Sequence, residues 1–125
     1  MSNCLAVAAL TLVLAEPVFT LDWTHSVERT AWREVWALQP GGLRLVEAAV
    51  KGSGAGMDPG EGAVLRDGWW VWAPDLAPQP SVTLAASGAT GGGWRLCSGE
   101  ECHVIGAEPG QAIRLAPCRR EDESD

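Results

Sequence analysis

The chain has 125 residues, of which 46% are hydrophobic, and its formal net charge is −7. These values are typical of one globular domain with a core of its own, and they exclude wholesale disorder. The segment from Arg119 to Asp125 holds two basic and four acidic residues, so the remaining chain is also acidic, with a net charge of −5. No cluster of Lys and Arg stands along the sequence, which argues against nucleic acid and anionic membranes as partners. We therefore predict a single β domain over residues 1–118 and a disordered acidic tail over residues 119–125.

An apolar run near the N-terminus, Leu5–Ala15, has two interpretations. It resembles the apolar centre of a signal peptide, but no Lys or Arg precedes Arg29, so the usual positive region is missing. The run is too short to cross a bilayer, and no membrane insertion is expected. Leucines alternate with other residues from Leu10 to Leu14, which favours strands. The lack of a convincing signal indicates a cytoplasmic location.

Short alternating apolar runs, separated by clusters drawn from 15 Gly and 8 Pro, predict an all-β fold. The natural architecture is a small antiparallel sandwich or a partly open barrel, with at most one short helix. That helix would be Val27–Leu38, where Trp32 and Trp36 are four residues apart, although the same segment also alternates as a strand. The expected strands are Cys4–Ala8, Leu10–Ala15, Val18–Val27, Glu34–Leu38, Leu43–Val50, Val64–Leu65, Trp69–Ala73, Val82–Ser87, Trp94–Cys97, His103–Ile105 and Ala112–Leu115.

The four cysteines are compatible with two disulfides. Cys97 and Cys102 flank a four-residue turn, and residues opposite each other in an antiparallel pair are close enough for a disulfide. Cys4 would then pair with Cys118 and join the two ends of the domain. The alternatives are four reduced thiols and a zinc site, which the single wide pair disfavours, so no metal is expected.

The strand predicted at Val18–Val27 defines a candidate site. Alternation places Trp23 and His25 on one face and Ser26 on the other, which excludes a catalytic pair of His25 and Ser26. A histidine beside a tryptophan, with Glu28 or Glu34 nearby, is typical of a ligand contact or an acid/base group. The alternative is a histidine that only caps the rim of the core.

Two further segments add candidate residues. The glycine-rich loop from Gly52 to Met57 lacks the ending of a phosphate loop and the third glycine of a dinucleotide fingerprint. Its Gly54 and Gly56 allow an anion-binding nest of N–H groups, or simply a turn. In the strand Trp69–Ala73, Trp69 and Trp70 point to opposite faces, and Trp70 is a candidate pocket residue.

The combination of Trp23–Glu28, Gly52–Met57, Asp67–Trp70 and Trp94–Cys97 resembles the bacterial family known as domain of unknown function 1850. The resemblance implies an accessory role in solute uptake by a tripartite transporter, with receptor or permease subunits as partners. It also implies a periplasmic location, and it brings no established biochemical activity and no cofactor.

The sequence thus predicts a non-catalytic module that binds a ligand or a partner. Its expected contact residues are Trp23, His25, Glu28, Glu34, Gly54, Gly56 and Trp70. One alternative is a small enzyme that uses His25 with Glu28 or Glu34 as acid and base. The other is a redox or structural protein whose functional element is the pair Cys97 and Cys102.

Overall fold

The computed structural model describes residues 3–24, 30–40, 42–51, 60–86 and 93–118, and these residues form an all-β sandwich. Eleven strands and no helix occur among them. The strands are β1 (Cys4–Val7), β2 (Leu10–Val13), β3 (Val18–Thr24), β4 (Ala31–Gln39), β5 (Gly42–Lys51), β6 (Val64–Arg66), β7 (Trp69–Trp72), β8 (Val82–Leu84), β9 (Trp94–Ser98), β10 (Glu101–Ile105) and β11 (Ile113–Pro117).

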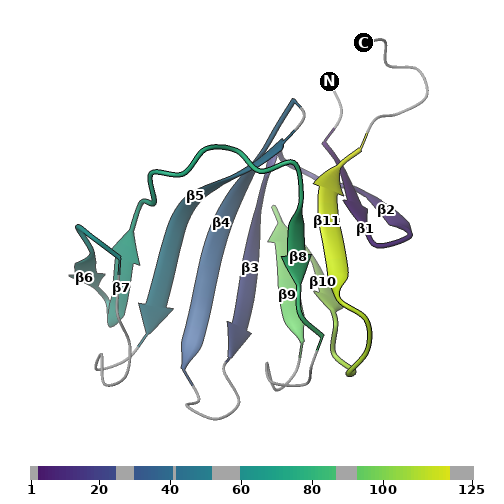
Figure 1. The fold of residues 1–125 in the computed structure, drawn as a ribbon. Coiled ribbons are helices and arrows are strands. Elements are labelled where there is room, and N and C mark those ends of the chain that lie inside the picture. The colour runs from purple at the N-terminus through teal and green to yellow at the C-terminus, as the bar shows by residue number, and fades with distance from the viewer. Residues whose placement is uncertain (1–2, 25–29, 41, 52–59, 87–92, 119–125) are drawn as a thin grey trace.

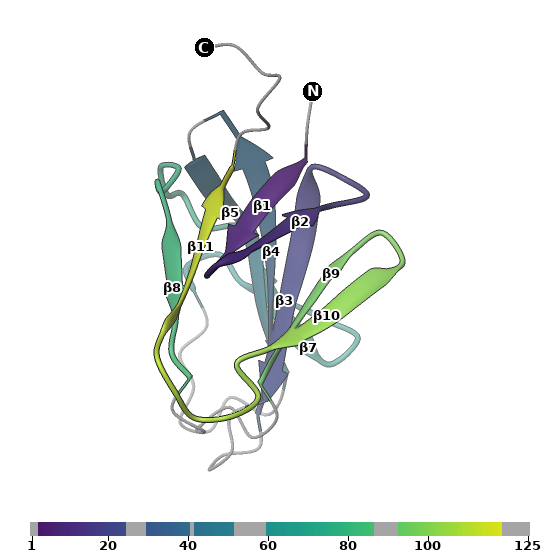
Figure 2. The ribbon, with the colours of Figure 1, turned by 90° about the vertical axis from the view of Figure 1, so that its right-hand side faces the viewer.

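The strands form two antiparallel sheets of unequal size. Sheet A has four strands in the order β2-β1-β11-β8, and sheet B has seven in the order β10-β9-β3-β4-β5-β7-β6. In Figure 1 the strands of sheet A lie in front of one side of sheet B, and β4, β5, β7 and β6 extend beyond them. Figure 2 shows the two layers from the side. The architecture is therefore an open sandwich and not a closed barrel.

The N-terminal apolar run belongs to the fold. It forms β1 and β2, and Leu5, Val7 and Leu14 are buried in the core. The prediction of strands there is confirmed. Within the described part of the chain, no helix has the length and apolarity needed to cross a membrane.

The helix considered for Val27–Leu38 is wrong in its described part, which is strand β4. Trp32 and Trp36 are four positions apart, an even offset, so they share a face on a strand as well as on a helix. Strand β4 pairs with β3 on one side and with β5 on the other, so its backbone groups are satisfied by both neighbours.

The core lies between the two sheets. Sheet B contributes Phe19, Leu21 and Leu96, and sheet A contributes Leu5 and Leu115, each no more than 1% exposed. Burying one such side chain stabilises a fold by about 1.5–3 kcal/mol. The alternation within each strand therefore fixes which face of each sheet turns inward.

One buried polar side chain, Ser98, connects β9 to the first residue of β3 and to the segment before it. Its hydroxyl donates to the Val18 carbonyl oxygen at 2.8 Å and accepts from the Glu16 backbone N–H at 3.1 Å. Ser98 is 3% exposed, so these bonds replace the hydrogen bonds that its hydroxyl would make to water in the unfolded chain.

Both predicted disulfides are present. Cys4–Cys118 joins the start of β1 to the residue that follows β11, and Cys97–Cys102 crosses from β9 to β10. The reduced-thiol and zinc alternatives are therefore wrong, since no cysteine is free. Disulfides of this kind are typical of proteins in oxidising compartments.

Candidate functional site

Four tryptophans form a row across the face of sheet B that is turned toward sheet A, which we call the inner face. Trp23 of β3 lies opposite Trp32 of β4. Val50 of β5 lies between two tryptophans, opposite Trp32 on one side and opposite Trp70 of β7 on the other. On the other side, the Trp94 ring of β9 packs against Trp23. We call Trp23, Trp32, Trp70 and Trp94 the tryptophan row.

The rings at the centre of the row are in contact. The centroids of Trp23 and Trp94 are 4.5 Å apart with the rings tilted by 46°, and those of Trp23 and Trp32 are 6.1 Å apart and nearly parallel. The Trp94 indole N–H donates to the Ala85 carbonyl oxygen at 3.0 Å, just beyond β8 of sheet A. Aromatic pairs of this kind each add about 0.5–1.5 kcal/mol beyond their buried area. The row is therefore anchored where the two sheets meet.

From that anchor the row runs out onto the part of sheet B that sheet A does not cover. Trp32 and Trp70 belong to β4 and β7, and no strand of sheet A lies in front of these strands in Figure 1. Both side chains remain partly exposed.

Glu34 lies on the same face, one row away. It is opposite Leu21 of β3 and Ala48 of β5, and Ala48 in turn is opposite Trp72 of β7. The Trp36 indole N–H donates to Glu34 Oε1 at 3.0 Å. The carboxyl group is thus set among apolar and aromatic neighbours.

Burial raises the pKa of Glu34 above its ordinary value, and the hydrogen bond from Trp36 acts in the opposite direction. The ion pairs found among the described residues both involve Asp22, on the other face of the sheet. Glu34 is therefore a carboxyl group whose burial is balanced by one indole N–H and by no cation of the described chain.

An open depression of about 590 Å³ lies at the end of the Glu34 row. Trp72 forms part of its wall, and Gly60 packs so closely on the Trp72 indole that a side chain there would collide with it. The residues that line the depression are Gly60, Glu61, Gly62, Trp72, Ala73, Pro74 and Asp75. Its ionisable groups are acidic, like Glu34.

The structure brings three of the predicted contact residues, Trp23, Glu34 and Trp70, to one face of one sheet. The other four, His25, Glu28, Gly54 and Gly56, lie outside the described residues. The prediction that Trp69 and Trp70 face opposite sides is confirmed by their pairing with Lys51 and Val50.

Sequence reasoning missed Trp32 and Trp94 as members of the row. Alternation alone places each tryptophan on a face of its own strand, but the row exists only because β9, β3, β4 and β7 have this order and register. Within the described ranges, no group of three or more His, Cys, Asp or Glu side chains has a metal-binding arrangement.

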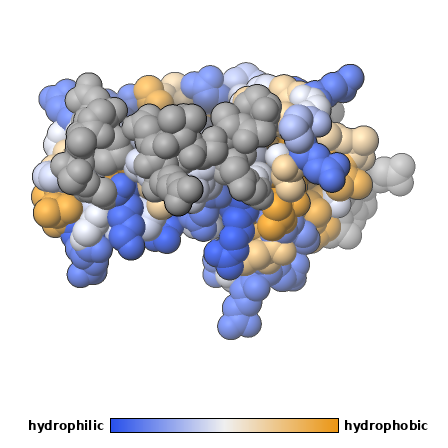
Figure 3. Space-filling model, turned by 90° about the horizontal axis from the view of Figure 1, so that it is seen from below, coloured by the Kyte–Doolittle hydropathy of each residue, from blue (hydrophilic) through white to orange (hydrophobic). Residues whose placement is uncertain are grey.

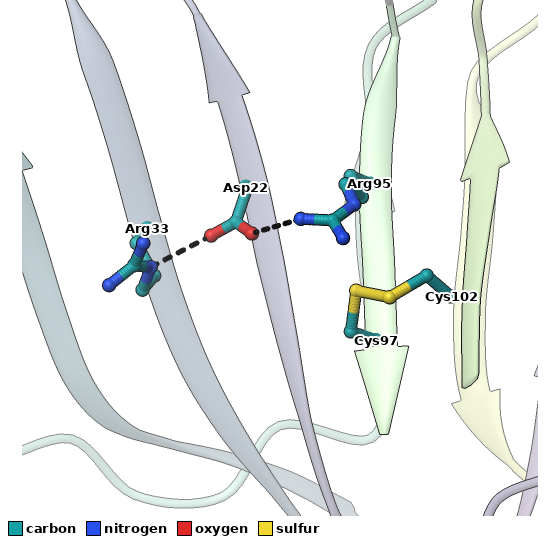
Figure 4. Close-up of polar contacts among 5 residues, drawn as sticks. All are labelled: Asp22, Arg33, Arg95, Cys97 and Cys102. Atoms are coloured by element: carbon teal, nitrogen blue, oxygen red, sulfur yellow. Dashed lines mark hydrogen bonds and ion pairs between the residues drawn. A yellow bond between two sulfur atoms is a disulfide. The ribbon is translucent and has the colours of Figure 1, made fainter. Parts of the chain in front are cut away.

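The opposite side of sheet B, its outer face, carries a different set of contacts. Asp22 accepts from Arg33 Nε at 3.0 Å, and Arg95 Nη1 lies 3.8 Å from the other carboxylate oxygen of Asp22 (Figure 4). The disulfide Cys97–Cys102 lies beside this cluster on β9 and β10. It is therefore on the face away from the tryptophan row.

These features define an open antiparallel β sandwich whose larger sheet bears a tryptophan-lined inner face with a partly buried carboxyl group. The chain belongs to the family described as domain of unknown function (DUF1850), whose model matches residues 19–105. No curated protein and no solved structure matches the chain. The matched range runs from within β3 to the end of β10 and so contains sheet B, whereas β1, β2 and β11 of sheet A lie outside it.

Proposed function

We propose that this protein is a non-catalytic binding module whose ligand surface is the tryptophan row together with Glu34. The observation that carries the proposal is a partly buried carboxyl group on the same face as partly exposed indole rings, with no cation of the described chain to balance it. Indole faces attract cations, and a carboxylate pairs with them. The ligand class that fits is a small organic cation with an apolar body.

We further propose that the module is an accessory to solute uptake by a tripartite transporter, with receptor or permease subunits as partners. The resemblance of the sequence to the family carries this expectation. The structural observation that supports it is the pair of disulfides, which are typical of a protein that folds outside the reducing cytosol.

The ligand surface is tested by calorimetric titration with three probes of similar shape and different charge: phenethylammonium, phenylethanol and phenylpropionate. The ammonium ion should bind most tightly. Replacing Trp70→Leu should weaken this binding, whereas Trp69→Leu, one residue away on the outer face, should not. Equal binding of the three probes, or equal effects of the two substitutions, would refute the proposal.

The role of Glu34 is tested by Glu34→Gln, which keeps an acceptor for the Trp36 indole N–H. The affinity for phenethylammonium should fall about tenfold, because a charge-assisted bond becomes a neutral one. Glu47→Gln is the matched control, because Glu47 lies on the adjacent strand and faces the outer side, opposite Val35. An unchanged affinity in the Glu34 variant would exclude the carboxyl group from the site.

A small enzyme is the second candidate, and the raised pKa of Glu34 favours it, because acid/base groups in enzymes are often perturbed by burial. The two candidates differ in turnover. A binding module returns the solute chemically unchanged after prolonged incubation, as chromatography would show. A product that disappears in the Glu34→Gln variant would establish the enzyme instead.

A further inference from the structure

The outer face of sheet B is rich in basic residues, although the chain is acidic. Residues opposite each other in antiparallel strands share a face, so the register assigns each charge to a side. The basic residues of the outer face are Arg33, Arg44, Lys51, Arg66 and Arg95. Its acidic residues are Asp22 and Glu47.

The net charge of this face has the opposite sign to the net charge of the whole molecule. Five of the nine Lys and Arg residues of the chain lie there with two acids, so the face has three net positive charges while the chain has a net charge of −7. All five basic residues are exposed. The other acidic side chains of the described residues lie on the inner face or in connections. The outer face is therefore positive while the rest of the described surface is acidic.

The contacts on this face hold part of the charge in place. Arg33 stacks on the ring of Trp69, with its guanidinium carbon 4.6 Å from the ring centroid, while its Nε donates to Asp22. Lys51 lies 5.8 Å from the same ring. The side chains of Arg33 and Arg95 are still 47% and 60% exposed. Their guanidinium groups are thus positioned before any partner binds, which lowers the entropic cost of binding.

Figure 3 shows the molecule from below, so its lower margin is the back of Figure 1. Hydrophilic side chains project along this margin, and apolar residues gather toward the side of β2 and β10. The back of Figure 1 is the side of sheet B turned away from sheet A. The outer face therefore carries charged groups with one aromatic residue, Trp69, among the basic ones, and exposed valines, Val18, Val64 and Val104, lie on the same face. Arg and Trp are the residue types that most often dominate the energy of protein interfaces.

We propose that the outer face of sheet B is a docking surface for a protein partner with an acidic patch. Charge complementarity carries the inference, because three net positive charges on one face attract acidic side chains. A protein with a local acidic patch meets only this face. A long polyanion such as duplex DNA, or an anionic bilayer, extends past the face and also meets the acidic remainder of the molecule, which repels it.

The experiment measures association of the intact protein with a fluorescent glutamate-rich peptide at low and at physiological ionic strength. Binding should occur despite the negative net charge of the protein, and salt should weaken it. Arg66→Glu and Arg44→Glu should each lower the association rate constant several-fold, up to about tenfold. Arg114→Glu is the matched control, since it changes the net charge equally but lies on β11 of sheet A. Thermal unfolding of each variant confirms that the fold is intact.

Each other outcome would overturn the proposal. No binding of the peptide, or an equal loss in the Arg114 variant, would mean that the outer face is not a docking surface. Tighter binding to duplex DNA or to phosphatidylglycerol vesicles than to the peptide would assign the face to another class of partner. Glu34→Gln and Trp70→Leu should leave peptide binding unchanged, so failure of the inner-face ligand site and failure of this surface are separate results.

Discussion

Removing the Cys4–Cys118 disulfide is expected to destabilise the protein much more than removing Cys97–Cys102. The two bridges differ in the length of chain that they close, with sequence separations of 114 and 5. In the chain-entropy model a crosslink restricts the unfolded chain more when the closed loop is longer. The model gives about 4.8 kcal/mol for the long loop and about 2 kcal/mol for the short one.

The perturbation is a pair of double variants, Cys4→Ala with Cys118→Ala, and Cys97→Ala with Cys102→Ala. For a chain of this length the unfolding entropy converts these free energies to losses of about 18 °C and about 8 °C in melting temperature. Burial in the folded state adds to this difference in stability, because Cys4 is 2% exposed whereas Cys102 is exposed.

The assay is thermal and urea-induced unfolding, followed by tryptophan fluorescence and by circular dichroism. Coincident transitions with both probes would justify a two-state treatment. Equal losses in the two double variants, or a larger loss for Cys97–Cys102, would refute the entropic reasoning.

Three further predictions concern single positions. Glu34→Gln should stabilise the fold at neutral pH, because the raised pKa of Glu34 means that the folded state disfavours the ionised carboxylate. This gain in stability should vanish as the pH falls below 4.5, the ordinary pKa of a glutamate side chain. Urea unfolding at a series of pH values measures this gain, and a gain independent of pH would contradict it. Gly93→Ala should cost about 1–3 kcal/mol, since Gly93 has a φ of 86° and a Cβ would lie 2.8 Å from Ala107 Cα. Gly110→Ala, where a Cβ meets nothing within 4 Å, is the control, and equal urea midpoints would count against the argument. Ser98→Ala should cost about 1–3 kcal/mol in urea unfolding, because the backbone groups that it bonds lose their buried partner; an unchanged midpoint would show that water replaces the hydroxyl.

The strands were largely predictable from the sequence, because alternation and turn residues are local signals. The strand expected at Val18–Val27 is β3, which ends at Thr24 in the described residues. The one expected at Glu34–Leu38 is longer, Ala31–Gln39, since its pairing with β3 and β5 extends it at both ends. The Cys97–Cys102 bridge was also predictable, because the turn between its ends is short.

The surfaces were less predictable, because they depend on which strands are neighbours. Arg33, Arg66 and Arg95 are far apart in the sequence and form no basic run, yet the strand order of sheet B places them on one face. The amino-acid sequence shows only which residues are neighbours along the chain, so it does not show this basic face. The tryptophan row was hidden for the same reason, since the sequence shows the face of each tryptophan but not the strand beside it.

The pairing of β1 with β11 also determines when the fold can be completed. Strand β1 has two neighbours, β2 next to it in the sequence and β11 near the C-terminus, whereas every strand of sheet B lies between them along the chain. During synthesis the N-terminal end of the chain appears first. All strands of sheet B can therefore pair while one edge of β1 is still unpaired. Sheet A closes only when residues 113–117 arrive, and the Cys4–Cys118 bond can form only after that. Such late pairing of distant strands slows folding and leaves an aggregation-prone edge exposed in the meantime. A protein of this topology is most vulnerable during its own synthesis, and a chain that stops short of β11 leaves one edge of its first strand unpaired.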